Sequence, residues 1–122
     1  MNEVIVLLGS NIDSLENIGK AKAFLVEIFG NVLFSNNIES EAVGNASGIY
    51  TNAVALINTA YNEKQIVERL KLIEQKSGRV KNINSADNVT IDLDLVQFNG
   101  SILRPEDAAR HYYISCLKDL GL

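Results

Sequence analysis

The sequence predicts an α+β fold: a ferredoxin-like βαββαβ sandwich, with a four-stranded antiparallel sheet, helices on one face and an added C-terminal helix. Short apolar runs alternate with segments whose apolar residues recur at helical spacing, in the order strand, helix, strand, strand, helix, strand. No repeat, linker or low-complexity segment interrupts the 122 residues, of which 47% are hydrophobic. Residues 1–122 are therefore expected to form a single domain with a sizeable core.

The first half of the chain contains one clear strand and one clear helix. Residues 3–8 are almost wholly apolar and end at a Gly-Ser-Asn turn, as a buried strand would. Asp13 and Glu16 have the spacing of a capping box, which predicts a helix that continues to Gly30. Its expected buried stripe consists of Leu15, Ile18, Ala21, Leu25 and Ile28. A weaker strand is predicted at residues 32–38, and a loop at 39–49.

The second half of the chain also contains strand and helix signals in alternation. Residues 50–57 indicate a central strand, and Asn62 with Gln65 predicts the capped start of a helix that Gly78 ends. Residues 79–89 are polar and unpatterned, which indicates a loop before the strand at 90–98. A last helix is expected to open at Pro105, with its buried side formed by Ala109, Tyr112, Cys116 and Leu120.

Composition narrows the classes of function. A net charge of −4 disfavours a general nucleic-acid binder, which needs a basic surface. The apolar run at residues 4–8 is too short for a signal core or a membrane span, so we expect a cytoplasmic protein with no membrane partner. Cys116 is the only cysteine, which excludes an internal disulfide and indicates a buried, inert thiol.

Asp92 and Asp94 stand out in the stretch "TIDLDLVQF" (residues 90–98). On a strand their side chains share one face, roughly 7 Å apart, while Ile91, Leu93 and Leu95 point to the other. Such alternation is also what any half-buried strand shows, so a solvated face is the plain alternative. The preceding loop contains Arg79 and Lys81, which favours a site where Mg²⁺ and these basic side chains both contact phosphate. No Walker-type glycine loop occurs.

Several segments together resemble the 6-hydroxymethyl-7,8-dihydropterin pyrophosphokinases of folate biosynthesis. They occur in the family's order, as "LGSN" (8–11), "YTNAVALINT" (50–59), "IEQKSGRV" (73–80), "TIDLDLVQFNG" (90–100) and "RHYYISCLKDL" (110–120). The resemblance implies transfer of pyrophosphate from ATP, the co-substrate, to the hydroxymethyl group of the pterin. It also implies one pterin pyrophosphokinase-like domain over residues 1–122.

The resemblance also implies residue roles. Asp92 and Asp94 would hold two Mg²⁺ ions, and together with Arg79 and Arg110 they would be the catalytic residues. The ATP-binding residues would be Glu74, Arg79, Lys81 and Arg110. The pterin-binding residues would be Ser40, Val43, Tyr50, Asn52 and Tyr112.

The chain departs from the family pattern at several points. Ala86 and Val89 stand where the family has a Trp and a second Arg, Glu41-Ala42 replaces a Pro-rich turn, and a Pro-His segment is missing. A rival alignment would match His111-Tyr112 to the family's His-Tyr pair. It leaves no late arginine, so His111 is interpreted as an ordinary helix histidine.

These departures leave alternatives to an active enzyme. A catalytically degenerate paralogue would bind pterin or magnesium-nucleotide without turnover, and the absent Trp and Arg favour it while the retained Asp pair argues against it. An unrelated ferredoxin-like interaction domain has only analogy of fold in its support. The oligomeric state is left open.

Overall fold

The computed structural model describes residues 1–41, 48–78 and 89–122. In these ranges, six strands form one sheet in the order β2-β4-β1-β5-β6, with β3 also paired to β4, and each of the pairs is antiparallel. The strands are β1 (Asn2–Ser10), β2 (Val32–Phe34), β3 (Ile38–Glu41), β4 (Ile49–Thr59), β5 (Asp92–Phe98) and β6 (Ser101–Ile102).

The prediction of a four-stranded sheet is therefore wrong, because two short strands are added to the four expected ones. β3 begins at the last residue of the predicted strand at 32–38, continues into the predicted loop at 39–49, and pairs with the first residues of β4. β6 has two residues and pairs with the end of β5. Both strands are too short for a periodic pattern, and they form where a longer neighbour offers free backbone groups.

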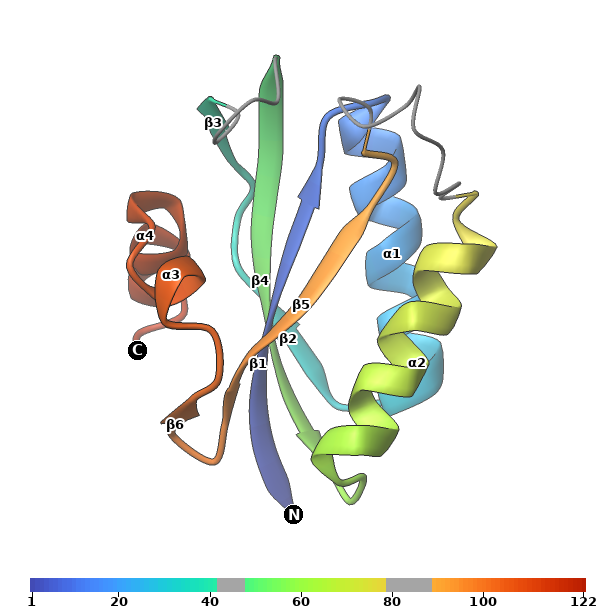
Figure 1. Cartoon of the computed structure of the whole chain (residues 1–122), viewed down its shortest axis with the longest axis vertical. Coiled ribbons are helices and arrows are strands. Elements are labelled where there is room, and N and C mark those ends of the chain that lie inside the picture. The colour runs from blue at the N-terminus through green and yellow to red at the C-terminus, as the bar shows by residue number, and fades with distance from the viewer. Residues whose placement is uncertain (42–47, 79–88) are drawn as a thin grey trace.

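Helices cover both faces of the sheet (Figure 1). α1 (Ser14–Phe29) and α2 (Glu63–Lys76) lie on one face, while α3 (Pro105–Ala108) and α4 (His111–Asp119) lie on the other. β1 explains how: Val4, Val6 and Leu8 pack in the core beneath α1 and α2, and Ile5 and Leu7 pack toward α4. The apolar run at the start of the chain is thus buried from both sides.

The helix ends follow local sequence only in part. Asn62 and Gln65 form the predicted capping box, with both hydrogen bonds at 2.9 Å, and Gly78 follows the helix with φ 83°. Asp13 has φ 40° and makes no side-chain cap bond, so the first predicted capping box is wrong. Asn17 instead donates to the Ile12 carbonyl at 2.6 Å, tying the first turn to the preceding loop.

The predicted C-terminal helix consists of two pieces, because Arg110 adopts an extended backbone (φ −69°, ψ 137°) between α3 and α4. Tyr112 and Cys116 are buried as predicted, whereas Ala109 is exposed. Tyr113 is buried as well, and its hydroxyl donates to Gln97 Oε1 at 2.6 Å. Within the described ranges, no helix combines the length and apolarity that crossing a bilayer requires.

Candidate active site

The site begins at a row of residues across three strands. Gly9 of β1 pairs with Asn52 of β4 on one side and with Asp92 of β5 on the other. Residues paired across a sheet point to the same face, so Asn52 and Asp92 flank a position without a side chain. Asp94 follows two residues along β5 on that same face, opposite Leu7. This is the face that α3 and α4 cover only partly (Figure 1).

The turn after β1 fixes the start of β5. Asn11 forms two bonds with Val89, accepting its N–H on Oδ1 at 2.6 Å and donating its own backbone N–H to the Val89 carbonyl at 3.0 Å. Ser10 donates its hydroxyl to the Thr90 carbonyl at 2.6 Å. The "GSN" segment therefore holds in place the two residues that lead into the Asp pair.

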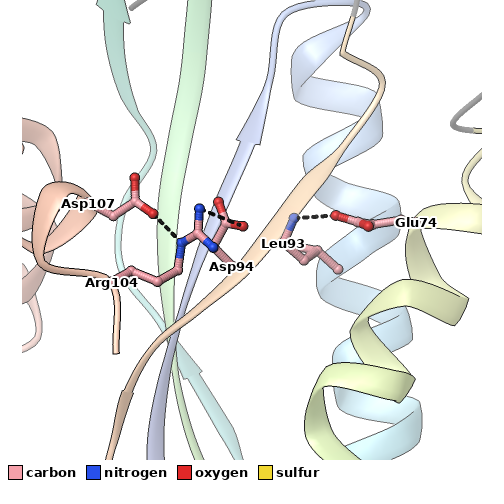
Figure 2. Close-up of polar contacts among 5 residues, drawn as sticks. All are labelled: Glu74, Leu93, Asp94, Arg104 and Asp107. Carbon is pink, nitrogen blue, oxygen red and sulfur yellow. Dashed lines mark hydrogen bonds and ion pairs between the residues drawn. The ribbon is translucent and has the colours of Figure 1, made fainter. Parts of the chain in front are cut away.

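The guanidinium of Arg104 lies between the carboxylates of Asp94 and Asp107 (Figure 2). Arg104 Nε is 2.5 Å from Asp107 Oδ2, and Arg104 Nη2 is 3.7 Å from Asp94 Oδ1. The pKa of Asp94 is raised to about 7, first by burial and then by the charge of Asp92 and a hydrogen bond with it, while the charge of Arg104 opposes the rise. Asp94 therefore carries a negative charge in a setting that does not fully stabilise it.

The open edge of β5 carries a groove of about 380 Å³ that runs from α2 to the residues before α3. Asp92, Asp94, Arg104, Lys71 and Glu74 are among its lining residues. Glu74 Oε2 accepts the Leu93 N–H at 2.9 Å, so this side chain takes the place of a neighbouring strand (Figure 2). The groove is therefore polar at its β5 side and framed by charges of both signs.

A second, smaller pocket of about 140 Å³ lies beside Asn52. Four of the five predicted pterin residues line it together with Glu41: Ser40, Tyr50, Asn52 and Tyr112. Asn52 is buried, and its Nδ2 donates to the Ile38 carbonyl at 3.1 Å and to Ser40 Oγ at 2.7 Å. Because a carbonyl can only accept, these bonds turn Asn52 Oδ1 toward Gly9, ready to accept a hydrogen bond.

Comparisons with known proteins give the family. The family model for 7,8-dihydro-6-hydroxymethylpterin-pyrophosphokinase matches residues 5–121. A 2-amino-4-hydroxy-6-hydroxymethyldihydropteridine pyrophosphokinase from Pseudomonas putida is 32% identical over 111 residues, which cover 88% of this chain and 92% of that protein. The chain belongs to this pyrophosphokinase family. Its members are ATP-dependent transferases of folate biosynthesis that use ATP and Mg²⁺.

The solved structures that match include a GlnK–ATP complex from B. subtilis. It is 16% identical in sequence, with a TM-score of 0.43, and the match covers 78% of this chain and 82% of the GlnK chain. Those values are too low to say anything about this pyrophosphokinase-family chain.

The late arginine predicted to bind phosphate lies at the N-terminus of α4. Arg110 is half-buried. Burial raises the pKa of Tyr112, and the charge of Arg110 offsets part of that rise. His111 is exposed, with its ring edge-on to Tyr112 at 5.4 Å between centroids. Arg110 is not among the residues that line either pocket.

Three predicted site residues lie outside the described residues: Val43, Arg79 and Lys81. Their roles in a family member remain predictions. The structure instead adds Arg104 and Asp107, which the sequence reasoning missed. No periodic or motif signal marks Arg104, because its meeting with Asp94 depends on how the β5–β6 hairpin returns the chain across the sheet.

The residues present fit a magnesium ion through their donor chemistry. Asp92 and Asp94 supply hard carboxylate oxygens, and one or two protein carboxylates are what Mg²⁺ uses when phosphate and water complete its shell. The Arg104 guanidinium already stands at Asp94 as a positive charge of the protein's own. In the described ranges, no group of three or more His, Cys, Asp or Glu gathers to form an all-protein cage.

Proposed function

We propose that this chain transfers the pyrophosphoryl group of ATP to the hydroxymethyl oxygen of 6-hydroxymethyl-7,8-dihydropterin, leaving AMP. Family membership supports the reaction class. The observation that carries the proposal for this chain is the row Asn52–Gly9–Asp92, which places a polar pocket and an acid pair on one face of the sheet. A substrate held at Asn52 would extend across Gly9 toward groups held at Asp92.

The pocket beside Asn52 suits a flat heterocycle with polar edges. Asn52 Oδ1 is positioned to accept a hydrogen bond from an N–H of the pterin, since Nδ2 is already bonded within the protein. Tyr50 and Tyr112 offer aromatic surfaces beside it, on which a ring can stack. Ser40 positions Asn52 and lines the pocket, and we place Val43 there as well.

Asp92 and Asp94 would hold the magnesium, and we propose two ions. Bound there, the metal would neutralise charge on the ATP phosphates. The raised pKa of Asp94 supports this placement, because a bound cation would stabilise the charged form of this carboxylate. The groove beside the pair would take the nucleotide, with Glu74 in its wall. We place Arg79, Lys81 and Arg110 on the phosphate side.

The chain's own part in the reaction would be positioning and charge. The pterin oxygen would bond to the β-phosphorus and give up its proton to water, while the bond from that phosphorus to the α,β-bridging oxygen breaks and AMP leaves with that oxygen. An alcohol is a weak acid, so holding the oxygen in line with the phosphorus contributes more than a strong base would. Asn52 and the tyrosines would orient the pterin, while Arg79 and Arg110 would stabilise charge on the phosphates.

We also propose that residues 1–122 form one pyrophosphokinase-like domain of ferredoxin-like topology that acts in the cytoplasm. The strand order β2-β4-β1-β5, with α1 and α2 on one face, supports this topology, and β3 and β6 would then be additions. The pterin and ATP would be its small-molecule partners.

The test is AMP release from ATP and Mg²⁺, with and without 6-hydroxymethyl-7,8-dihydropterin, for the wild type, Asp92→Ala and Asp94→Ala. We expect pterin-dependent AMP from the wild type, lost by at least about a hundredfold in both variants because a charge-stabilising group is gone. Glu27→Ala, which removes an exposed carboxylate on α1, is the control and should match the wild type.

Two results would contradict the proposal. Unchanged turnover in either Asp variant would remove the acid pair from the reaction. A folded wild type that binds pterin but releases no AMP would leave a binding protein without turnover.

A further inference from the structure

Arg104 makes two unequal contacts. Its Nε lies 2.5 Å from Asp107 Oδ2, a close charge-assisted hydrogen bond. Its Nη2 lies 3.7 Å from Asp94 Oδ1, which is beyond hydrogen-bond distance and leaves only electrostatic attraction. The contact with Asp94 can therefore be given up while the contact with Asp107 is kept.

The backbone around Arg104 is fixed on both sides. The Leu103 N–H donates to the Val96 carbonyl at 2.7 Å, and the Arg104 carbonyl accepts the Ala108 N–H at 3.0 Å. The Arg104 side chain is half exposed, whereas the Asp94 and Asp107 side chains are each 20% exposed. A conformational change at this point would therefore move the Arg104 guanidinium rather than the backbone, because the half-exposed side chain has room to turn.

The surroundings supply a second place for that guanidinium. Arg104 lines the same groove as Asp92, Asp94 and Lys71, at the open edge of β5. A guanidinium that stays bonded to Asp107 would still face this groove with its Nη atoms. Its planar donor geometry matches phosphate oxygens, and it is always charged.

We propose that Arg104 is the resident counter-ion of the Asp92–Asp94 pair, that a divalent cation displaces it from Asp94, and that Asp107 then holds it against the phosphates of the bound nucleotide. The inference rests on the proposed metal site and adds a phosphate-binding residue to it. Arg104 thereby opposes binding of metal alone and favours binding of metal with nucleotide. A purely structural arginine would have no reason to act in opposite directions on the two.

The experiment measures two affinities in the full chain: Mn²⁺ alone, followed by electron paramagnetic resonance, and α,β-methylene-ATP with saturating Mg²⁺, followed by calorimetry. In Arg104→Gln we expect Mn²⁺ alone to bind about threefold to tenfold more tightly, because a competing positive charge is gone. The nucleotide analogue should bind about tenfold more weakly, because one charge-assisted hydrogen bond to its phosphates is lost.

Asp107→Asn and Arg69→Gln complete the design. Asp107→Asn releases the guanidinium to pair fully with Asp94, so Mn²⁺ alone should bind more weakly than in the wild type. Arg69→Gln removes a guanidinium that stacks on Tyr61, 3.7 Å from the ring centroid and outside the groove lining, and should change neither affinity. If Arg104→Gln does not fold, Arg104→Lys should keep the wild-type affinity for Mn²⁺ and weaken binding of the analogue.

The outcomes separate this inference from the proposal beneath it. Wild-type Mn²⁺ binding that Asp92→Asn and Asp94→Asn leave unchanged would overturn both. Binding that depends on these acids, with Arg104→Gln altering both affinities in the same direction or neither, would overturn the role of Arg104 alone.

Discussion

Asn52 and Asp92 lie on either side of one residue, Gly9, in a single row across the sheet. Two strand spacings separate their backbones, which is roughly 10 Å. Gly9 leaves the floor between them bare, and a Cβ placed there would meet Asn52 Oδ1 at 3.6 Å and Tyr50 Cδ1 at 3.7 Å. The fold thus tolerates a side chain at Gly9, whereas a substrate lying across the row would not.

Gly9→Ala should therefore separate stability from function. Both contacts of the new methyl group are ordinary van der Waals distances, and Ala restricts the unfolded chain more than Gly, so the free energy of unfolding should hold or rise by about 0.5 kcal/mol. Pterin affinity should fall because the methyl group covers the floor beside Asn52. Titration with the pterin and thermal melting measure the two effects.

Gly19→Ala is the matched control, since Gly19 lies within α1 with nothing within 4 Å of a built Cβ. It should stabilise the helix by about 0.5–1 kcal/mol and leave pterin binding unchanged. Full pterin affinity in Gly9→Ala would show that the substrate does not cross this row.

The raised pKa of Asp94 makes the metal-free protein less stable at higher pH. Between the ordinary value of 3.8 and about 7, the folded state keeps a proton that the unfolded chain has lost, so the free energy of unfolding falls as pH rises through this range. Asp94→Asn should remove this dependence and stabilise the metal-free protein at pH 8 by about 1–2 kcal/mol. Urea unfolding at pH 5 and pH 8, with EDTA present, measures it.

Glu106→Gln serves as the control for Asp94→Asn, because Glu106 is an exposed acid of α3. Its stability should follow the wild type at both pH values. An Asp94→Asn variant that is equally destabilised at pH 5 and pH 8 would mean that the acid is held by favourable contacts rather than strained by burial.

Asn52→Ala should cost both stability and binding. The Ile38 carbonyl and Ser40 Oγ would lose their donor in a buried setting, which costs about 1–3 kcal/mol. Pterin affinity should fall by about tenfold or more through loss of the Oδ1 acceptor. Asn58→Ala, on the same strand but outside the pocket lining, should leave affinity intact. An Asn52→Ala protein that binds pterin normally would place the pterin elsewhere.

Glu74 has a structural role that can be distinguished from nucleotide binding. Glu74→Ala should lower the free energy of unfolding by about 1–2 kcal/mol, because the Leu93 N–H at the sheet edge loses its acceptor. Glu74→Gln keeps an acceptor oxygen and should recover most of that stability. If ATP affinity is also recovered in Glu74→Gln, the side chain acts by holding β5; if it stays low, the carboxylate charge itself serves the nucleotide.

Much of the fold follows from local pattern. The order of the main strands and helices, the burial of the first strand and the Asn62 capping box are all readable from apolar spacing and cap residues, which act between near neighbours in the chain. The acid pair on one face of β5 is readable for the same reason, since alternation along a strand is a local property.

Other features depend on which segments meet. Strands β3 and β6 are too short to show a period and exist because β4 and β5 offer partners. The meeting of Arg104 with Asp94, and of Glu74 with the Leu93 N–H, is set by the path of the chain around the sheet. No spacing in the sequence encodes those distances.

The sequence by itself therefore determined the main elements, the family resemblance and the residue types that the chemistry needs. Only the tertiary structure decided that Asn52 and Asp92 share a row across Gly9 and that a guanidinium stands at Asp94. The physical reason is that periodicity reports which face a residue takes within its own element, whereas strand register and chain return decide which faces come together.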